Sequence, residues 1–353
     1  MKLVSVIIPT YNRGHCVTDA IDSALGQTHR AVEVVVLDDG SSDGTDGLIA
    51  ERYRHEPRVR YVQQANAGVV AARNAALERC TGDYVAFLDS DDTWFPWKLE
   101  LQLAALTAEP RAGMVWTDME AVDPDGRVVH ARYLRRMYGA YRWQPGSDKL
   151  FSRAFRLDLA AVGQVQAYAG DIYRRMIAGN LIHTSTVLLT RRRLEQVGGF
   201  DPALKVSGED YDFHLRTCRE GPVAFLDVAS IRYRTGMDDQ LSRKGAVMAV
   251  NFLATISKAV DRDGPVFPRR MLAAGFGDAH RWLAETLIAE GDFQAGRLHY
   301  LRSLRHQPWQ PRAVAQIALC SLPPGLGNRL RAAYGGLKAL GRAVPAGSGP
   351  RAP

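Results

Sequence analysis

Acidic side chains gather at three places where their spacing could support metal binding or proton transfer. Asp89, Asp91 and Asp92 follow an apolar run in VAFLDSDDTW (85–94), Asp39 lies in DDGSSDGT, and Glu209 and Asp210 lie in GEDYDF. Packed carboxylates repel one another, so a cation or open water should lie beside the first group. Carboxylates separated by one residue, as in Asp89 and Asp91, suit a hard ion such as Mg²⁺ or Mn²⁺.

A structural role for the same acidic stretch stays open at this point. Acidic residues also favour the first turn of a helix, and WFPWKLE directly follows Asp92. Negative charge there interacts favourably with the helix dipole. Helix capping and metal binding are compatible, so one reading does not exclude the other.

The elements that must position these acids alternate along the first 90 residues. Strands are predicted at 3–9, 32–40, 59–64 and 83–89, with helical patterns that open at Asn12, at Thr45 and at 67–80. Such alternation predicts an α/β fold with a parallel sheet covered on both faces. Ligands of such sheets bind beyond the carboxyl ends of the strands. The segments PTYN, DDGSSDGT and DSDD should therefore converge on one edge.

The rest of the chain divides into a mixed part and a helical part. Strands are predicted at 112–118, 183–190 and 222–228, and helices at 98–106, 191–201 and 208–221, while 130–180 has no firm period and is interpreted as a variable flap. From about residue 245 the pattern is helical and similar to one and a half tetratricopeptide units. We predict domains at 1–240 and 241–343, with a disordered tail at 344–353.

Charge is distributed unevenly over the 353 residues, whose formal net charge is +7. No acidic residue follows Asp292, and the same segment carries Arg297, Arg302, Arg305, Arg312, Arg329, Arg331, Lys338, Arg342 and Arg351. Such a basic segment favours anionic lipid or is simply a solvated face. Four scattered cysteines indicate a reducing compartment, and no apolar stretch is long enough to span a membrane. We expect a cytoplasmic protein, peripheral on the inner face of the membrane if the basic segment binds lipid.

The order of the motifs resembles that of family 2 glycosyltransferases. The matching segments are VSVIIPTYNR, VVVLDDGSSDGT, NAGVVAARNAAL, VAFLDSDD, VGGFD and GEDYDF, and together they cover about residues 1–240. The resemblance implies the GT-A fold, a nucleotide-binding α/β sandwich, here with a C-terminal all-helical extension. It also implies inverting transfer of a sugar from a nucleotide diphosphate donor with the help of Mg²⁺ or Mn²⁺.

The resemblance assigns roles residue by residue on the donor side. Asp91 is implied as the direct metal ligand, with Asp89 and its neighbour Ser90 nearer the sugar or ribose. Asp39 is implied to accept a hydrogen bond from the ring N–H of uracil. The other nucleotide-binding residues implied are Pro9, Thr10, Tyr11, Asn12 and Arg73. Each also has a plain structural reading, as a turn residue, a strand end or a surface arginine.

Asp210 is implied as the general base, with Glu209 as its acceptor-side or supporting neighbour. The acceptor hydroxyl must lose its proton as it attacks the anomeric carbon. Two departures from the family pattern limit this picture: YRTGMDDQLS (233–242) lacks a histidine that relatives often carry, and the Gln-x-x-Arg-Trp signature of processive members is absent. Transfer of a single sugar is therefore expected. His183 and His214 are interpreted as structural.

We expect a UDP-sugar transferase that acts in bacterial polysaccharide or glycolipid assembly. Its partners would be the nucleotide-sugar donor and a glycan, lipid-linked or small-molecule acceptor, and no nucleic acid. Two alternatives stay open. One is a sugar-nucleotide nucleotidyltransferase, although PTYNRGH is poor in the glycines that such enzymes use. The other is a non-enzymatic scaffold that binds partners through its C-terminal helices. A dinucleotide enzyme is excluded because no G-x-G-x-x-G follows the first strand.

Overall fold

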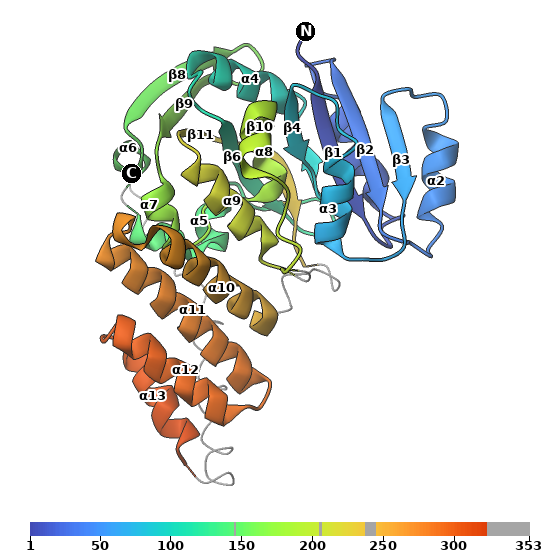
Figure 1. The fold of residues 1–353 in the computed structure, drawn as a ribbon. Coiled ribbons are helices and arrows are strands. Elements are labelled where there is room, and N and C mark those ends of the chain that lie inside the picture. The colour runs from blue at the N-terminus through green and yellow to red at the C-terminus, as the bar shows by residue number, and fades with distance from the viewer. Residues whose placement is uncertain (145, 205–206, 237–244, 323–353) are drawn as a thin grey trace, which may run out of the picture. The chain divides into compact units, whose positions relative to one another are not determined.

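A mixed β-sheet forms the centre of the protein (Figure 1). The computed structural model describes residues 1–144, 146–204, 207–236 and 245–322. The sheet has the order β3-β2-β1-β4-β10-β6-β11-β9-β8, while β5 pairs with β11 and β7 pairs with β6. The strands are β1 (Val4–Thr10), β2 (Val32–Asp38), β3 (Val59–Gln63), β4 (Tyr84–Phe87), β5 (Thr93–Trp94), β6 (Met114–Val122), β7 (Val128–His130), β8 (Arg153–Leu159), β9 (Gly163–Gly170), β10 (Leu188–Thr190) and β11 (Val223–Arg234).

Helices cover the sheet, as the complete burial of β1 requires. Figure 1 shows α3, α8 and α9 in front of the strands. The helices of the mixed part are α1 (Val17–Leu25), α2 (Thr45–Arg52), α3 (Val69–Leu77), α4 (Lys98–Ala108), α5 (Leu134–Met137), η1 (Gly139–Trp143), α6 (Ser147–Leu150), α7 (Tyr173–Met176), η2 (Thr184–Thr186), α8 (Arg191–Val197) and α9 (Glu209–Arg219). The first helix begins at Val17 rather than at Asn12, because Asn12 adopts a left-handed conformation with φ 51°.

The α/β alternation predicted for the first 90 residues is confirmed. Strand β1 pairs in parallel with β2 and β4, and β2 pairs in parallel with β3. Beyond these strands the sheet is mixed, because β10 runs antiparallel to both β4 and β6. An apolar run indicates burial and says nothing of strand direction, so the sequence could not show this reversal.

The loops after β1, β2 and β4 leave the sheet at the same edge. In the register, Thr10 lies beside Asp38 and Ile7 lies beside Phe87, so each strand ends within a few residues of its neighbour. The three loops therefore emerge together, as predicted from their position at the carboxyl ends of parallel strands.

The segment 130–180, interpreted as a variable flap, contains an antiparallel hairpin. Strands β8 and β9 pair along their length, and β9 pairs with β11 at the end of the sheet. Most side chains of β8 are exposed. Both strands do alternate, since Phe155, Leu157 and Leu159 of β8 are less exposed than Arg156 and Asp158, so this period-2 pattern was present in the sequence and was missed.

Aromatic packing joins α9 to β4 beneath the acidic loop. The ring of Phe87 meets Phe200 and Phe213 edge-on at 5.3 and 5.6 Å, and Phe200 stacks on Phe213 at 4.3 Å. Asn74 holds Phe200 by donating to its carbonyl and accepting from its N–H. A Cβ at Gly199 would lie 2.6 Å from the Asn74 Oδ1 atom, so the glycine of VGGFD permits this close approach.

The remaining helices are α10 (Gly245–Asp263), η4 (Gly264–Val266), α11 (Arg269–Ala289), α12 (Phe293–His306) and α13 (Pro311–Cys320). The chain forms two compact units that divide within α11, between Gly275 and Phe276. In the first unit, α10 packs on α9 through Phe252, which stacks on Tyr211 at 4.5 Å. The boundary predicted at residue 240 stays a prediction, because packing does not show which part folds independently.

The second unit has a small core of its own. Ala284, Tyr300 and Ala313 are buried together, with Ile288, Leu304 and Ile317 packed around them. Asp292 caps α12 by accepting from the Ala295 N–H, at the Gly-Asp turn predicted between two helices. The tail predicted at 344–353 lies outside the described residues. Among the helices of the described ranges, none has the length and apolarity that a membrane crossing requires.

Candidate active site

The acidic loop after β4 packs three carboxylates into a small, partly buried space. Asp92 is almost fully buried, while Asp89 and Asp91 are half-buried. Burial and the charges of Asp92 and Asp89 raise the pKa of Asp91 to about 7, against the opposing effect of Arg13. The nearest approach between Arg13 and Asp91 is 4.0 Å. Asp91 is thus a carboxylate whose ionised form a nearby cation would stabilise.

Arg73 connects the acidic loop to the start of α9. Its guanidinium lies 2.7 Å from Asp89 Oδ1 and 2.5 Å from Glu209 Oε1, and its side chain is 6% exposed. The arginine also lies over the ring of Phe200, 5.3 Å from the centroid. Asp89 and Glu209 raise the pKa of Arg73 against the effect of burial. The arginine therefore carries a fixed charge and sets the spacing between two predicted site residues.

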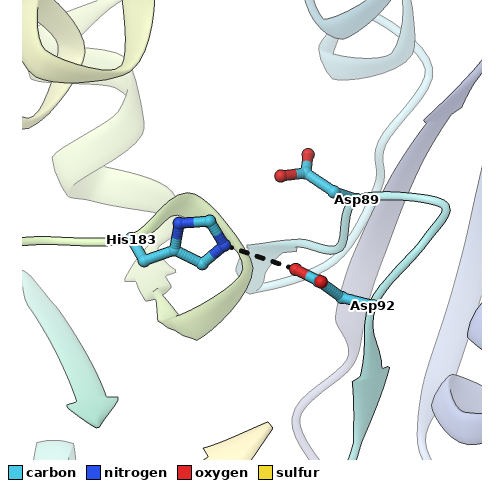
Figure 2. Close-up of side chains that lie close together, drawn as sticks. All are labelled: Asp89, Asp92 and His183. Atoms are coloured by element: carbon cyan, nitrogen blue, oxygen red, sulfur yellow. Dashed lines mark hydrogen bonds and ion pairs between the residues drawn. The ribbon is translucent and has the colours of Figure 1, made fainter. Parts of the chain in front are cut away.

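His183 completes a second group of side chains around the same loop. Its Nε2 lies 3.3 Å from Asp92 Oδ2, and its Nδ1 lies 3.2 Å from the hydroxyl of Tyr138. Figure 2 shows the imidazole and the carboxylates of Asp89 and Asp92 turned toward a common space. One ligand atom from each of these three residues lies within 4.8 Å of the others. Imidazole and carboxylate together suit a divalent transition ion such as Mn²⁺ or Zn²⁺.

Asp210 lies in the first turn of α9, next to Glu209. Gly208 precedes the helix with φ 84°, a conformation that glycine adopts without strain. Burial raises the pKa of Asp210, while the backbone N–H of Tyr211 and the charges of Arg73 and His183 oppose the shift. Burial likewise raises the pKa of Glu209, with Arg73 opposing. The raised pKa of Asp210 strengthens it as a proton acceptor.

The predicted nucleotide-binding residues form a second group, at the ends of β1 and β2. The Asp39 N–H donates to the Thr10 carbonyl, and Asn12 exchanges hydrogen bonds with Ser41 and Ser42. Both oxygens of the Asp39 carboxylate accept from the segment before α3, at Gln64, Ala67 and Gly68. In this structure Asp39 therefore shapes the loop that begins α3.

Two predicted residues at this edge have atoms or surfaces suited to a ligand. Tyr11 is 50% exposed at the end of β1. Thr10 is buried, and its hydroxyl has no hydrogen-bond partner among the described residues. Near the acidic loop, the Oε2 atom of Glu209 is also buried and has no hydrogen-bond partner among the described residues. Pro9 is buried within β1 and Ser90 within the acidic loop. The structure thus brings four predicted site residues together: Arg73, Asp89, Glu209 and Asp210. Asp91 lies in the acidic loop after β4, together with Asp89.

Sequence reasoning set aside or missed three residues of the site. His183, which is interpreted from the sequence as structural, contacts Asp92. The other histidine interpreted as structural, His214, is fully buried, and burial lowers its pKa to about 3, which fits that role. Tyr138 reaches His183 from the segment between α5 and η1. Asn180 donates to Asp210 from the loop after α7. These contacts join positions 30 to 91 residues apart, so no local pattern marks them.

A family model described as Glycosyl transferase family 2 matches residues 5–163. This segment contains β1 from its second residue, β2 to β4, the acidic loop and all of the predicted nucleotide-binding residues. Residues 5–163 of this chain therefore belong to glycosyltransferase family 2. The resemblance to this family is thereby confirmed, and four of the six motifs lie within or overlap the matched residues.

The curated relatives agree with this family. A chondroitin synthase of Escherichia coli is 37% identical over 75% of this chain and 33% of its own length. The teichuronic acid biosynthesis glycosyltransferase TuaG of Bacillus subtilis, a putative assignment, is 46% identical over 36% of this chain and 53% of its own. The chain therefore spans only a third to a half of these relatives.

Two solved structures share the fold of this chain. S. aureus TarS 1-349 in complex with UDP-GlcNAc aligns with a TM-score of 0.57 at 20% identity, over 90% of each chain. Mannosyltransferase PcManGT from Pyrobaculum calidifontis, in complex with GDP-Man and Mn²⁺, aligns with a TM-score of 0.56 at 18% identity, over 95% of this chain and 80% of its own. The GT-A fold class predicted from the motifs is confirmed.

Proposed function

We propose that the chain is an inverting glycosyltransferase that moves one sugar from a nucleoside diphosphate to an acceptor hydroxyl. The observation that carries this proposal is the link through Arg73 between Asp89 of the acidic loop and Glu209, the neighbour of Asp210. A donor-side carboxylate group and a potential base are thus held at fixed spacing. Transfer with inversion needs this arrangement, because the leaving diphosphate and the attacking oxygen lie on opposite sides of the anomeric carbon.

In the proposed reaction Asp210 accepts the proton of the acceptor hydroxyl. The hydroxyl oxygen forms a bond to the anomeric carbon as the bond from that carbon to the diphosphate oxygen breaks. The electron pair leaves with the nucleoside diphosphate, and the proton stays on Asp210. Arg73 favours the ionised form of Glu209 against the effect of burial and holds it at a fixed distance from Asp89.

The acidic loop fits a divalent cation. Asp91 is the carboxylate whose pKa the other acids raise most clearly, whereas Asp89 is paired with Arg73 and Asp92 with His183. We therefore propose Asp91 as the principal ligand, with Asp89, Asp92 and His183 as the alternative set. When bound, Mg²⁺ or Mn²⁺ would neutralise charge on the departing diphosphate.

The finer features of the substrate rest on the relatives. We propose a UDP-sugar as the donor; TarS is solved with UDP-GlcNAc, whereas PcManGT, which is equally similar in fold, is solved with GDP-Man. The similarity to a chondroitin synthase and to TuaG supports a polysaccharide or glycolipid acceptor in a bacterial cell. The two alternatives left open by the sequence, a nucleotidyltransferase and a scaffold, receive no support from these relatives.

A thermal-shift screen of nucleotide sugars, with and without Mn²⁺, tests the proposal. We expect a UDP-sugar to raise the melting temperature, and Mn²⁺ to increase that rise. The Asp91→Asn variant is the matched control and should lose the Mn²⁺ effect while keeping the fold. If no UDP-, GDP- or other nucleotide sugar stabilises the protein in either condition, the proposal is wrong.

We also propose that the protein acts on the cytoplasmic side, in contact with anionic lipid through its basic C-terminal segment. Arg297, Arg302, Arg305 and Arg312 lie in the described part of this segment, where no acidic residue follows Asp292. Sedimentation of the full chain with phosphatidylglycerol vesicles should exceed that with phosphatidylcholine vesicles, and salt should remove the difference. Equal sedimentation at low salt would contradict the contact.

A further inference from the structure

Asn180 contacts the proposed base through an amide whose orientation is fixed. Its Nδ2 donates to Asp210 Oδ2 at 3.1 Å, and its Oδ1 accepts from the backbone N–H of Ile182, also at 3.1 Å. Only the carbonyl oxygen of an amide accepts a hydrogen bond from an N–H group. The bond to Ile182 therefore requires that the NH₂ group, rather than the oxygen, face Asp210.

The backbone around Asn180 is held on both sides. Before it, the Tyr211 hydroxyl donates to the Met176 carbonyl; after it, the Tyr141 hydroxyl donates to the Leu181 carbonyl. At Gly179, φ is 139°, and an added Cβ would lie 2.8 Å from the Cβ of Ala140. Asn180 itself is 7% exposed. The amide is thus a rigid donor rather than an adaptable surface side chain.

This donor is the only side chain among the described residues that hydrogen-bonds to Asp210. A donor at Oδ2 favours the ionised carboxylate and holds its plane, which leaves Oδ1 to receive a proton from an acceptor. We propose that Asn180 is the positioning residue of the general base, an inference that rests on the proposed function of Asp210.

The charged and titratable groups around Asp210 act in both directions. Arg73 and His183 favour its ionised form, and Asp89 and Glu209 oppose it. The phenol of Tyr138 also lies within electrostatic range of Asp210. Asn180→Ala changes none of these groups, so a change in the pKa of Asp210 in that variant reports on the loss of the amide.

Two substitutions separate positioning from mere packing. Asn180→Asp keeps the size of the side chain and an oxygen for the Ile182 N–H, but it places an acceptor against Asp210. Asn180→Ala removes both contacts. If Asn180 only supported the loop, the Asp variant would be the better tolerated. If Asn180 positions Asp210 and favours its ionised form, Asn180→Asp loses more transfer activity than Asn180→Ala, because two carboxylates then face each other.

The experiment measures transfer against pH for the wild type, both Asn180 variants and Asp210→Asn. We expect kcat to fall about 10-fold in Asn180→Ala and further in Asn180→Asp, as for loss of a hydrogen bond to a charged group. The acidic limb of the kcat profile should move to higher pH by about one unit, while the donor KM stays within about 2-fold. Asn251→Ala, which removes an amide donor to the Ser207 carbonyl, should leave the pH profile unchanged.

A readout without turnover accompanies the kinetics. Carboxyl ¹³C titrations of full-length wild type and Asp210→Asn identify the Asp210 signal, and its pKa should rise in both Asn180 variants. An unchanged pKa, or Asn180→Asp more active than Asn180→Ala, would overturn the inference. Failure of the proposed function looks different: Asp210→Asn would then retain transfer, or the wild type would lack it, whatever the Asn180 variants do to the Asp210 pKa.

Discussion

Replacing Arg73 by methionine should destabilise the first unit strongly. The substitution keeps an unbranched side chain beside Phe200 but removes the charge that pairs with Asp89 and Glu209. Glu209 is 6% exposed, so it would remain as a buried carboxylate without a cation. Breaking a buried ion pair by removing one partner costs about 3–5 kcal/mol, and we expect a loss of free energy of unfolding in that range.

Hydrogen exchange measured by mass spectrometry detects this loss of stability locally, in peptides from β4 and α9, the elements beside Arg73. Local measurement is needed because the two compact units need not unfold in one two-state transition. The double variant Arg73→Met with Glu209→Gln should recover part of the stability, since it removes the uncompensated charge. Arg127→Met, at an exposed pair with Asp125, is the matched control and should change nothing measurable. Protection in β4 and α9 that stays at the wild-type level in Arg73→Met would refute the reasoning.

Two further predictions concern the metal and a buried lysine. Asp91→Asn should abolish stabilisation by Mn²⁺, whereas His183→Ala should only weaken it. If metal titrations show the larger loss in His183→Ala, the ion is held by Asp89, Asp92 and His183 instead. Lys98 is fully buried, and burial lowers its pKa well below 10.5. The unfolded chain therefore binds a proton that the folded chain lacks, so stability rises with pH between the lowered pKa and 10.5. Lys98→Met should flatten that rise in urea titrations at successive pH values, and equal slopes would contradict the argument.

The parallel half of the fold was predictable because its strands are buried on both faces. Residues 3–9 and 32–40 are β-branched runs that stop at polar loops, and the structure places β1 and β2 there. The expected strand at 183–190 is divided between a 3₁₀ turn at Thr184–Thr186 and the short strand β10 at Leu188–Thr190. The residues of the 3₁₀ turn, Thr184–Thr186, are buried and partly β-branched, and burial of this kind is compatible with a helix turn as well as a strand.

The acids of the site were predictable from local spacing, whereas their partners were not. Asp89 and Asp91 stand out because carboxylates rarely follow a buried strand without a ligand or a counter-charge. Nothing in the sequence near Asn180 or Tyr138 indicates that they reach residues far away in the chain. Such pairings are decided by how the loop after α7 and the segment before η1 pack, and tertiary packing leaves no periodic signal.

The most direct test of the account compares Asp210→Asn with the wild type in two measurements on the same preparations. Calorimetry should show UDP binding in the presence of Mn²⁺ within about 2-fold of the wild type, while transfer from the UDP-sugar falls by at least about 100-fold, the lower range for loss of a general base. Transfer at the wild-type rate, or loss of UDP binding together with transfer, would contradict the role of Asp210 as the base.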